Sequence, residues 1–324
     1  MTSATHPFDV LASDLNAVNR RLESACELEH PMLRGALTQV LLAPAKRIRP
    51  ILTLASGRLF GEATAPLHSM AAAVEFLHTA TLIHDDVVDL TASRRGQPAL
   101  YTQVGNAVSV LVGDYLFAQA AATASETNNL RIMRLFAESV MTLCAGQVAE
   151  VSRGLGDDAW IDRADYYRTI EAKTAALFVL ACHSGAILGE APADGTEALR
   201  RYGRSLGLAF QIVDDILDLT GDEAELGKPV GSDLRQGVIT LPLIYLRDEL
   251  PESTFRRAFS TDGEREQAIE EITAAAPTSR GVARAHEEAR CLAEEAAQAL
   301  DQTPDNGSRE VLHALTRQVV DRTR

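Results

Sequence analysis

Two aspartate-rich pentapeptides are the residues of this chain best suited to do chemistry. They read Asp85-Asp86-Val87-Val88-Asp89 and Asp214-Asp215-Ile216-Leu217-Asp218, and each follows a strongly apolar stretch. On a helix, residues i and i+4 share a face, so the first and last aspartates of each pentapeptide point together. Carboxylates crowded in this way repel each other, and the negative end of the helix dipole adds to that repulsion. A bound cation would offset both effects.

The ligand type indicates which cation this is. Carboxylate oxygens select a hard ion, and Mg²⁺ commonly bridges one or two carboxylates to substrate phosphates. A single Asp-Asp-x-x-Asp motif would more simply be a solvated acidic helix end, but two copies on apolar helices would be too unfavourable without a counter-ion. We therefore predict a magnesium site made by Asp85, Asp86, Asp89, Asp214, Asp215 and Asp218.

Basic side chains near these motifs could hold a phosphorylated substrate. They occur before the first apolar stretch, after each aspartate motif, and once inside an apolar helix, where Lys173 is followed by Thr174. A lysine in that last position could also be a side chain that extends to solvent. Taken with the acidic motifs, the set supplies the fixed cations that a diphosphate needs: Lys46, Arg47, Arg49, Arg94, Arg95, Lys173 and Lys228.

The elements that must position these residues are predicted to be helices. Apolar residues recur at spacings of three and four, and runs of alternating β-branched residues are scarce. The segment 105–113 is apolar nearly all round, which predicts a helix in the middle of a bundle. Segment 251–310 carries many charges and is predicted to form outer, solvated helices. We expect one large all-α domain over residues 1–324.

Composition narrows the function classes. The net charge of −14 over 324 residues argues against a nucleic-acid partner, which would require a basic face. The four cysteines are far apart, which favours free thiols in a reducing compartment over a disulfide framework. We see no signal peptide and no apolar stretch long enough for a transmembrane segment, so a cytoplasmic location is expected.

The order of the motifs resembles the trans-isoprenyl (polyprenyl) diphosphate synthases. The resemblance extends from about residue 30 to 245 and weakens over the outer helices, about 251–324. It is carried by three elements: Lys46-Arg47-Ile48-Arg49-Pro50, Asp85-Asp86-x-x-Asp89-x4-Arg94-Arg95-Gly96, and Gly203-x3-Gly207-x2-Phe210-Gln211-x2-Asp214-Asp215-x-x-Asp218.

This resemblance implies a fold, an assembly and a reaction. The fold would be a large helical bundle around a deep central apolar cavity, of the isoprenoid synthase type, in a chain that forms a homodimer. The two aspartate motifs would face each other across the mouth of the cavity and bind about three Mg²⁺ ions. Isopentenyl diphosphate would be joined head to tail to an allylic diphosphate primer, with trans geometry.

The resemblance also assigns roles by matching position. Asp85, Asp89 and Asp214 would be direct metal ligands, and the other three aspartates would support them. Isopentenyl diphosphate would be held by Lys46, Arg49, His78 and Arg95. The allylic diphosphate would be held by Arg94, Lys173 and Lys228, with Thr174 and Gln211 beside the reacting carbons. His84 is more simply a packed helix residue than a base.

Product length is predicted from the residues before the first aspartate motif. One helical turn advances about 5.4 Å, roughly one isoprene unit. Ala80 and Thr81 therefore mark the first level below Asp85, Leu77 the second, and Ala73 and Val74 the third. The small Ala80 leaves the first level open, which resembles synthases of long chains, beyond C20, for quinone tails. A short-chain farnesyl or geranylgeranyl diphosphate synthase is the alternative. Val238 stands where many short-chain members have lysine.

Two rival functions are less well supported by the sequence. A terpene cyclase shares the helical fold but normally has a different second metal motif and needs no isopentenyl site. A non-catalytic partner subunit of a heteromeric synthase generally has degraded aspartate motifs, and both motifs are complete here.

Overall fold

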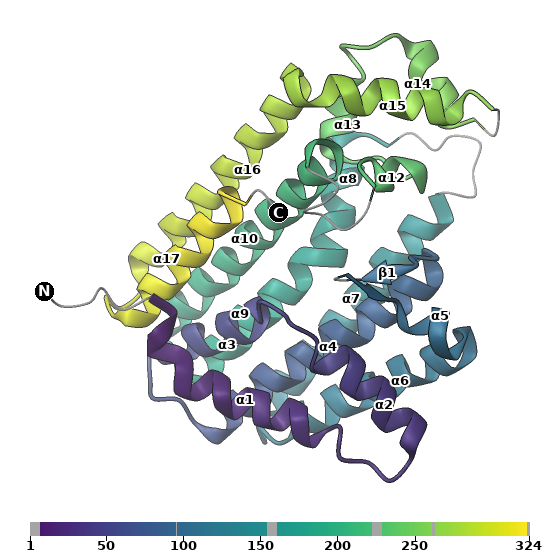
Figure 1. Cartoon of the computed structure of the whole chain (residues 1–324). Helices are drawn as coiled ribbons and strands as arrows, with labels where there is room; N and C mark the ends of the chain where they lie inside the picture. Colours follow the sequence, from purple (N-terminus) through teal and green to yellow (C-terminus); the bar gives the residue numbers. More distant parts are fainter. Residues whose placement is uncertain (1–6, 95, 154–160, 222–228, 261–262, 323–324) are drawn as a thin grey trace, which may run out of the picture. The chain divides into compact units, whose positions relative to one another are not determined.

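The described part of the chain is almost entirely helical (Figure 1). The computed structural model describes residues 7–94, 96–153, 161–221, 229–260 and 263–322. Within these ranges the strands are β1 (Ser93–Arg94) and β2 (Gln97–Pro98), which pair antiparallel. The prediction of an all-α fold is confirmed. The helices are η1 (Pro7–Leu11), α1 (Ala12–Ser24), α2 (Pro31–Leu41), α3 (Ile48–Arg58), α4 (Ala65–Val88), α5 (Leu100–Val104), α6 (Asn106–Ser125), α7 (Leu130–Arg153), α8 (Arg163–Ile170), η2 (Glu171–Ala175), α9 (Ala176–Leu188), α10 (Ala193–Thr220), α12 (Ser232–Arg235), α13 (Leu241–Leu246), α14 (Glu252–Ala258), α15 (Arg265–Ala275), η3 (Ala276–Thr278), α16 (Arg280–Ala299), η4 (Leu300–Gln302) and α17 (Gly307–Val320).

The helices form two compact units. The first unit comprises Met1–Val140, Leu177–Gly203 and Ala299–Leu315. The second unit comprises Met141–Ala176, Arg204–Gln298 and Thr316–Arg324. The first aspartate motif belongs to the first unit and the second motif to the second unit.

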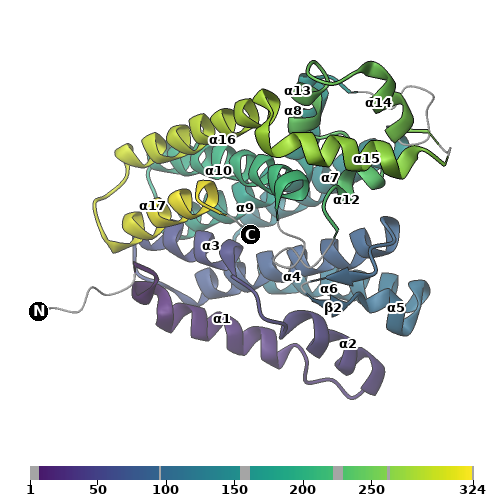
Figure 2. The same ribbon diagram turned by 45° about the horizontal axis from the view of Figure 1, so that its top comes forward.

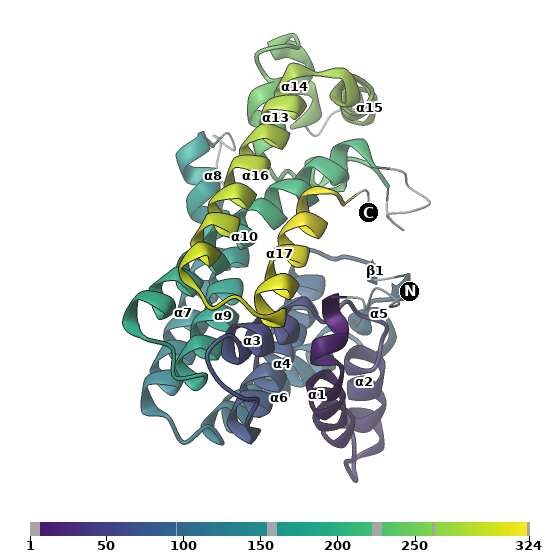
Figure 3. The ribbon, with the colours of Figure 1, turned by 90° about the vertical axis from the view of Figure 1, so that its left-hand side faces the viewer.

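Helix α4 is the centre of the first unit. Nearly all of its side chains from Leu67 to Ala80 are buried, and α1, α3 and α6 pack against it (Figures 1 and 3). A proline at Pro66 suits its first turn, where no intrahelical donor is needed. The helix ends at Val88, so the first aspartate motif occupies its last turn, as the sequence predicted.

Close backbone contact fixes α3 in the first unit. A Cβ atom on Gly185 would lie 2.3 Å from the carbonyl oxygen of Thr53, and one on Gly189 would lie 2.2 Å from that of Gly57. Only glycine fits at such distances, so α3 and the end of α9 meet through their backbones. The basic residue Arg49, in the first turn of α3, is thereby held in place.

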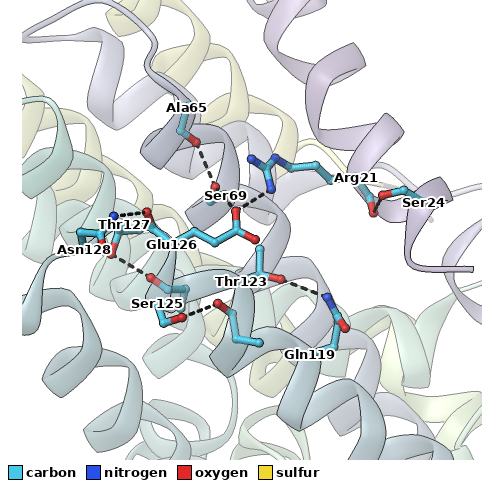
Figure 4. Close-up of polar contacts among 12 residues, drawn as sticks. Arg21, Ser24, Ala65, Ser69, Gln119, Thr123, Ser125, Glu126, Thr127 and Asn128 are labelled. Atoms are coloured by element: carbon cyan, nitrogen blue, oxygen red, sulfur yellow. Dashed lines mark hydrogen bonds and ion pairs between the residues drawn. The ribbon is translucent and has the colours of Figure 1, made fainter.

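A polar network joins α1, α4 and α6 near the start of α4 (Figure 4). The carboxylate of Glu126 accepts hydrogen bonds from Arg21 Nη1 at 2.7 Å and from Ser69 Oγ at 2.8 Å, and Gln119 donates to Thr123 at 3.3 Å. A polar cavity of about 220 Å³ adjoins this network. It has room for several water molecules at about 30 Å³ each. Its lining residues are Arg21, Ser24, Ala25, Leu28, Phe76, Tyr115, Gln119, Thr123 and Glu126.

In the second unit, one carboxylate links three helices. Glu288 on α16 accepts hydrogen bonds from Arg163 Nη2 at 2.8 Å, from the Tyr167 hydroxyl at 2.6 Å and from the Tyr245 hydroxyl. These donors lie on α8 and α13, which pack side by side (Figure 2). Arg284 adds a guanidinium 4.0 Å from the centre of the Tyr245 ring. The network fixes α8 from the side that faces α16.

Two sequence expectations about apolar helices were wrong. The segment 105–113 does not lie inside a bundle, because on α6 the side chains of Val110 and Leu111 are 39% and 66% exposed. One face of this helix packs on α4 and another is open in the single chain. The sequence was also expected to contain no apolar stretch long enough for a transmembrane segment. Three helical segments are nevertheless long and apolar enough, by length and composition alone, to cross a membrane: Asn106–Ser125, Leu130–Ser152 and Arg163–Leu188.

Candidate active site

In the basic segment before α3, one side chain is paired inside the protein and its neighbour is exposed to solvent. Arg47 adopts a left-handed backbone conformation, with φ at 50°, and its Nη1 lies 2.6 Å from Oε1 of Glu75 on α4. Glu75 is almost fully buried, so this ion pair compensates an interior charge. Lys46, the preceding residue, is exposed. Arg47 thus anchors the segment and presents its neighbour to solvent.

Arg49 and His78 come together across α3 and α4. The Arg49 Nη1 atom lies 3.0 Å from His78 Nε2, and its guanidinium carbon lies 5.1 Å from the centre of the Phe178 ring. His78, Asp85 and Asp89 are spaced so that they share one face of α4. The structure therefore brings together two of the residues predicted to hold isopentenyl diphosphate, Arg49 on α3 and His78 on α4, the helix that carries the first aspartate motif.

The second aspartate of the first motif is bound to the hairpin that follows it. Arg94, on β1, donates from Nε at 2.8 Å and from Nη2 at 2.6 Å to the same oxygen of Asp86. Burial raises the pKa of Asp86, while the hydrogen bond and the charge of Arg94 lower it. Asp85 and Asp89 are half-buried, in contrast to the buried Asp86. Arg94 thus orients the middle aspartate from the protein side.

The side chains predicted to measure product length are packed among other residues. Ala80 and Leu77 are fully buried, and Thr81 is half-buried with its hydroxyl bonded to the His78 carbonyl at 2.8 Å. A cavity of about 60 Å³ adjoins another face of α4, next to Asp86 and Arg94. None of the three length residues lines this cavity or the polar cavity beside Phe76.

A chain of hydrogen bonds holds the second aspartate of the second motif. Thr174 Oγ1 donates to Gln211 Oε1 at 2.6 Å, and Gln211 Nε2 donates to Asp215 at 2.7 Å. The Tyr166 hydroxyl donates to the other oxygen of Asp215 at 2.6 Å. Burial, and after it the nearby charge of Asp233, raise the pKa of Asp215 well above its ordinary value, although these two side-chain hydrogen bonds oppose the shift.

The third aspartate of the second motif organises the loop that follows α10. The backbone N–H of Asp233 donates to Asp218 Oδ2 at 3.0 Å, and the N–H of Gly231 donates to the Asp218 carbonyl at 2.7 Å. Asp218 is 2% exposed. Its side chain therefore supports the backbone leading into α12.

The first aspartate of the second motif is open to solvent and meets an arginine from the end of the chain. The Asp214 side chain is 50% exposed, and its Oδ1 lies 3.4 Å from Nη2 of Arg322. The guanidinium carbon of Arg322 also lies 4.6 Å from the centre of the Phe210 ring. Each motif therefore has a half-buried or exposed first aspartate and a buried second aspartate bonded to the protein.

Lys173 and Thr174 lie in a single turn of π-helix, η2, between α8 and α9. The Lys173 ammonium pairs with the carboxylate of Glu150 on α7. Both groups are partly exposed, at 28% and 22%. Short π-helical turns are frequent at functional sites, and this one presents a cation and a hydroxyl next to each other.

The donor set fits a magnesium ion that is completed by substrate. Among the residues that the structure describes, no group of three or more His, Cys, Asp or Glu side chains is arranged to hold a metal ion. Mg²⁺ usually takes one or two carboxylates together with water and phosphate oxygens. The accessible carboxylates of Asp85, Asp89 and Asp214 can supply that number in each unit.

Several contacts of the site had no signal in the sequence motifs. Tyr166, Glu150, Glu75 and Arg322 each bind a predicted site or anchoring residue, yet belong to none of the motifs. Two predicted substrate residues, Arg95 and Lys228, lie outside the described residues.

The fold and the paired aspartate motifs define a helical enzyme built for diphosphate substrates, and comparison with known proteins agrees. Residues 30–276 match the Polyprenyl synthetase family. The chain is 35% identical over 316 residues to solanesyl diphosphate synthase 1 of Arabidopsis thaliana, covering 95% of this chain and 76% of that protein.

Two solved structures are similar over almost their whole length. A polyprenyl synthase from Caulobacter crescentus CB15, complexed with calcium and isoprenyl diphosphate, has a TM-score of 0.92 and 35% identity, covering 98% of this chain and 97% of that one. A decaprenyl diphosphate synthase from Rhodobacter capsulatus has a TM-score of 0.90 and 37% identity, covering 98% of both chains.

The chain belongs to the polyprenyl synthetase family. The predicted family, the isoprenoid synthase fold and the class of enzyme, a prenyl transferase, are therefore confirmed.

Proposed function

We propose that the protein condenses isopentenyl diphosphate with an allylic diphosphate, head to tail and in trans, to make a polyprenyl diphosphate longer than C20. The observation that carries the proposal is that the first and second aspartates of each motif differ in burial and in hydrogen bonding. Asp86 and Asp215 are buried and hydrogen-bonded to protein groups, whereas Asp85 and Asp214 are more accessible. This arrangement repeats in both units and suits carboxylates that are oriented from behind and meet an ion in front.

The residues of the chain have distinct roles in this proposal. Arg49, His78 and Lys46 bind the diphosphate of isopentenyl diphosphate, while Lys173 and Arg94 bind that of the allylic primer. Magnesium, when bound to the aspartates, stabilises the charge that develops on the departing diphosphate.

The reacting carbons need a dry and oriented setting. Thr174 and Gln211, already bonded to each other, lie beside them, and the apolar residues around α4 exclude water that would quench an allylic cation. The proton lost after the new bond forms goes to the released diphosphate.

A long product is supported by the small residue at Ala80 and by the relatives. Solanesyl and decaprenyl diphosphate synthases are among the similar proteins. We propose that the tail extends along α4 past the level of Ala80 and Leu77, and that the product supplies a quinone side chain. A short-chain synthase is the alternative, and product analysis separates the two.

We propose that the enzyme is a homodimer that associates through α7. Exposed residues on this helix recur at spacings of seven, four and three: Leu130, Ala137, Met141, Cys144, Val148 and Val151. Leu130 is 85% exposed, and Met141 and Val148 are each 64% exposed. This spacing is that of a helix seam that packs against a second helix.

Charge insertion on α7 tests the dimer. Met141→Glu or Val148→Glu should produce monomers in analytical ultracentrifugation. The control Ala149→Glu adds the same charge on an exposed position of the same helix, off the stripe, and should remain dimeric. A wild-type protein that sediments as a monomer would overturn this part of the proposal.

We further propose that residues 1–324 act as one functional domain in the cytoplasm, with no nucleic-acid partner. Matching residues 30–276 span parts of both units. All four cysteines are free, with Cys26 and Cys182 buried and Cys144 and Cys291 exposed, which suits a reducing compartment.

One assay tests the proposed reaction. Purified protein is incubated with labelled isopentenyl diphosphate, Mg²⁺ and, separately, geranyl, farnesyl and geranylgeranyl diphosphate. A polyprenyl synthase incorporates label into dephosphorylated products longer than C20. A terpene cyclase would release a hydrocarbon from the allylic substrate without incorporating label, and a non-catalytic partner subunit would give no product alone.

A further inference from the structure

The side chain of Arg322 is packed against the helix that carries the second aspartate motif. Its guanidinium stacks on Phe210 at 4.6 Å and reaches Asp214 at 3.4 Å. Phe210 and Asp214 are four residues apart on α10 and therefore share a face, so one side chain can span both. Arg322 is only 19% exposed although it lies two residues beyond the end of α17. Its guanidinium is thus packed onto α10, not simply extended into solvent.

The position of Arg322 bears directly on metal binding. A guanidinium beside Asp214 Oδ1 supplies the positive charge that this carboxylate otherwise receives from a divalent ion. Mg²⁺ requires oxygen ligands at about 2.0–2.1 Å, and two cations on one carboxylate oxygen repel each other. Arg322 and a metal ion at Asp214 are therefore competitors.

We propose that Arg322 is a resident counter-ion of Asp214 that a divalent cation displaces, so that metal loading releases the C-terminal segment from α10. This inference rests on the proposed role of Asp214 as a metal ligand. It assigns Arg322 as a positioning residue, which holds the end of the chain on the motif before metal binds. By linkage, whatever Arg322 contributes to that hold weakens metal binding by the same factor.

Manganese provides a probe that does not depend on turnover. Free Mn²⁺ measured by electron paramagnetic resonance gives its affinity for wild type, Arg322→Ala and Arg322→Gln. Both variants should bind Mn²⁺ about two- to tenfold more tightly, as expected for loss of a competing ion pair with a stacked guanidinium. The control Arg317→Ala removes an exposed arginine from the same terminal helix and should match wild type.

Amide hydrogen exchange provides an independent readout of the C-terminal segment. In wild type, exchange over residues 316–322 should speed up when Mn²⁺ saturates the protein. In Arg322→Ala the same segment should exchange fast with or without the ion. Unchanged exchange in wild type, or Mn²⁺ affinity in Arg322→Ala and Arg322→Gln equal to or weaker than in wild type, overturns the inference.

An Asp214→Ala variant separates this inference from the proposed function. If Asp214→Ala binds Mn²⁺ as wild type does, the metal role of Asp214 is wrong and the inference fails with it. If Asp214→Ala loses Mn²⁺ while the Arg322 variants behave as wild type, the metal role stands and only the exchange is refuted.

Discussion

Replacing Tyr166 with phenylalanine tests whether the buried aspartate of the second motif must be held by its hydrogen bonds. Tyr166 and Asp215 are 2% and 3% exposed, and the hydroxyl lies 2.6 Å from the carboxylate. A hydrogen bond to a charged group contributes roughly 1.5–3 kcal/mol. Its loss leaves Gln211 as the remaining side-chain donor to Asp215 given by the structure. We expect the free energy of unfolding to fall by roughly that amount.

Activity should fall as well, because Asp215 is adjacent to Asp214 and bonded to Gln211. If the whole loss appears in the transition state, the rate drops by about ten- to a hundredfold, at roughly 1.4 kcal/mol per factor of ten. Urea unfolding gives the stability, and incorporation of labelled isopentenyl diphosphate at saturating Mg²⁺ gives the rate.

The adjacent residue provides a matched control. Tyr167 also donates to a carboxylate at 2.6 Å, but its partner is Glu288 on α16, which has no predicted contact with substrate. Tyr167→Phe should therefore lower stability while leaving the rate within about threefold of wild type, a change worth less than about 1 kcal/mol. Equal rate losses in both variants, or a Tyr166→Phe enzyme with wild-type rate, would refute the reasoning.

Three further predictions follow from the same contacts. Asp85→Ala or Asp214→Ala should lower the rate by several orders of magnitude, while thermal unfolding followed by circular dichroism stays unchanged. A variant that keeps more than about a tenth of the wild-type rate, which corresponds to about 1.4 kcal/mol of barrier, would contradict the metal assignment. Ala80→Phe should shorten the product to about fifteen to twenty carbons if one helical turn spans one isoprene unit. Chromatography of the dephosphorylated products measures their length, and products that stay long would show that another residue limits chain growth. Burial raises the pKa of Glu288, but the hydrogen bonds from Arg163, Tyr167 and Tyr245 outweigh it, so the folded-state pKa lies below 4.5. The stabilisation by Glu288 is therefore present at pH values above the ordinary pKa of glutamate and is lost as the pH falls through the folded-state pKa. The difference in melting temperature between wild type and Glu288→Gln should accordingly shrink in acid and not in base.

Local patterns in the sequence were enough to predict the helices that carry the site. The apolar run before Asp85 has the spacing of a buried helix, and the structure places the first aspartate motif at the end of that helix. The family resemblance assigned Thr174 and Gln211 to positions beside the reacting carbons, and in the structure Thr174 Oγ1 lies 2.6 Å from Gln211 Oε1. These features depend on residues within a few turns of each other or on a motif in a fixed order.

Contacts between distant segments could not be predicted in the same way. Tyr166 is 49 positions from Asp215, and nothing in its neighbours marks it as the donor. The left-handed backbone at Arg47 is set by its buried ion pair with Glu75, although arginine has no preference for that conformation. The open face of α6 was missed because an apolar pattern indicates burial without saying whether the same chain or a second chain provides it.

The π-helical turn η2 changes which side chains of α8 and α9 point in the same direction. Tyr166 and Thr174 are eight residues apart, and at 100° per residue an uninterrupted α-helix would turn them about 80° away from each other. Both nevertheless bond to α10, at Asp215 and Gln211, which are themselves one turn apart. A π-turn takes up one additional residue, which brings the eight-residue separation close to two whole turns. Deleting a single residue such as Ala172 would leave the two side chains seven residues apart, and in a regular helix they would then differ by only about 20° and still face α10. The π-turn thus accommodates one additional residue without changing the direction of the flanking side chains. Converting η2 to regular α-helix with that residue kept would turn Tyr166 and Thr174 about 80° apart and cost the anchoring of either Asp215 or Gln211.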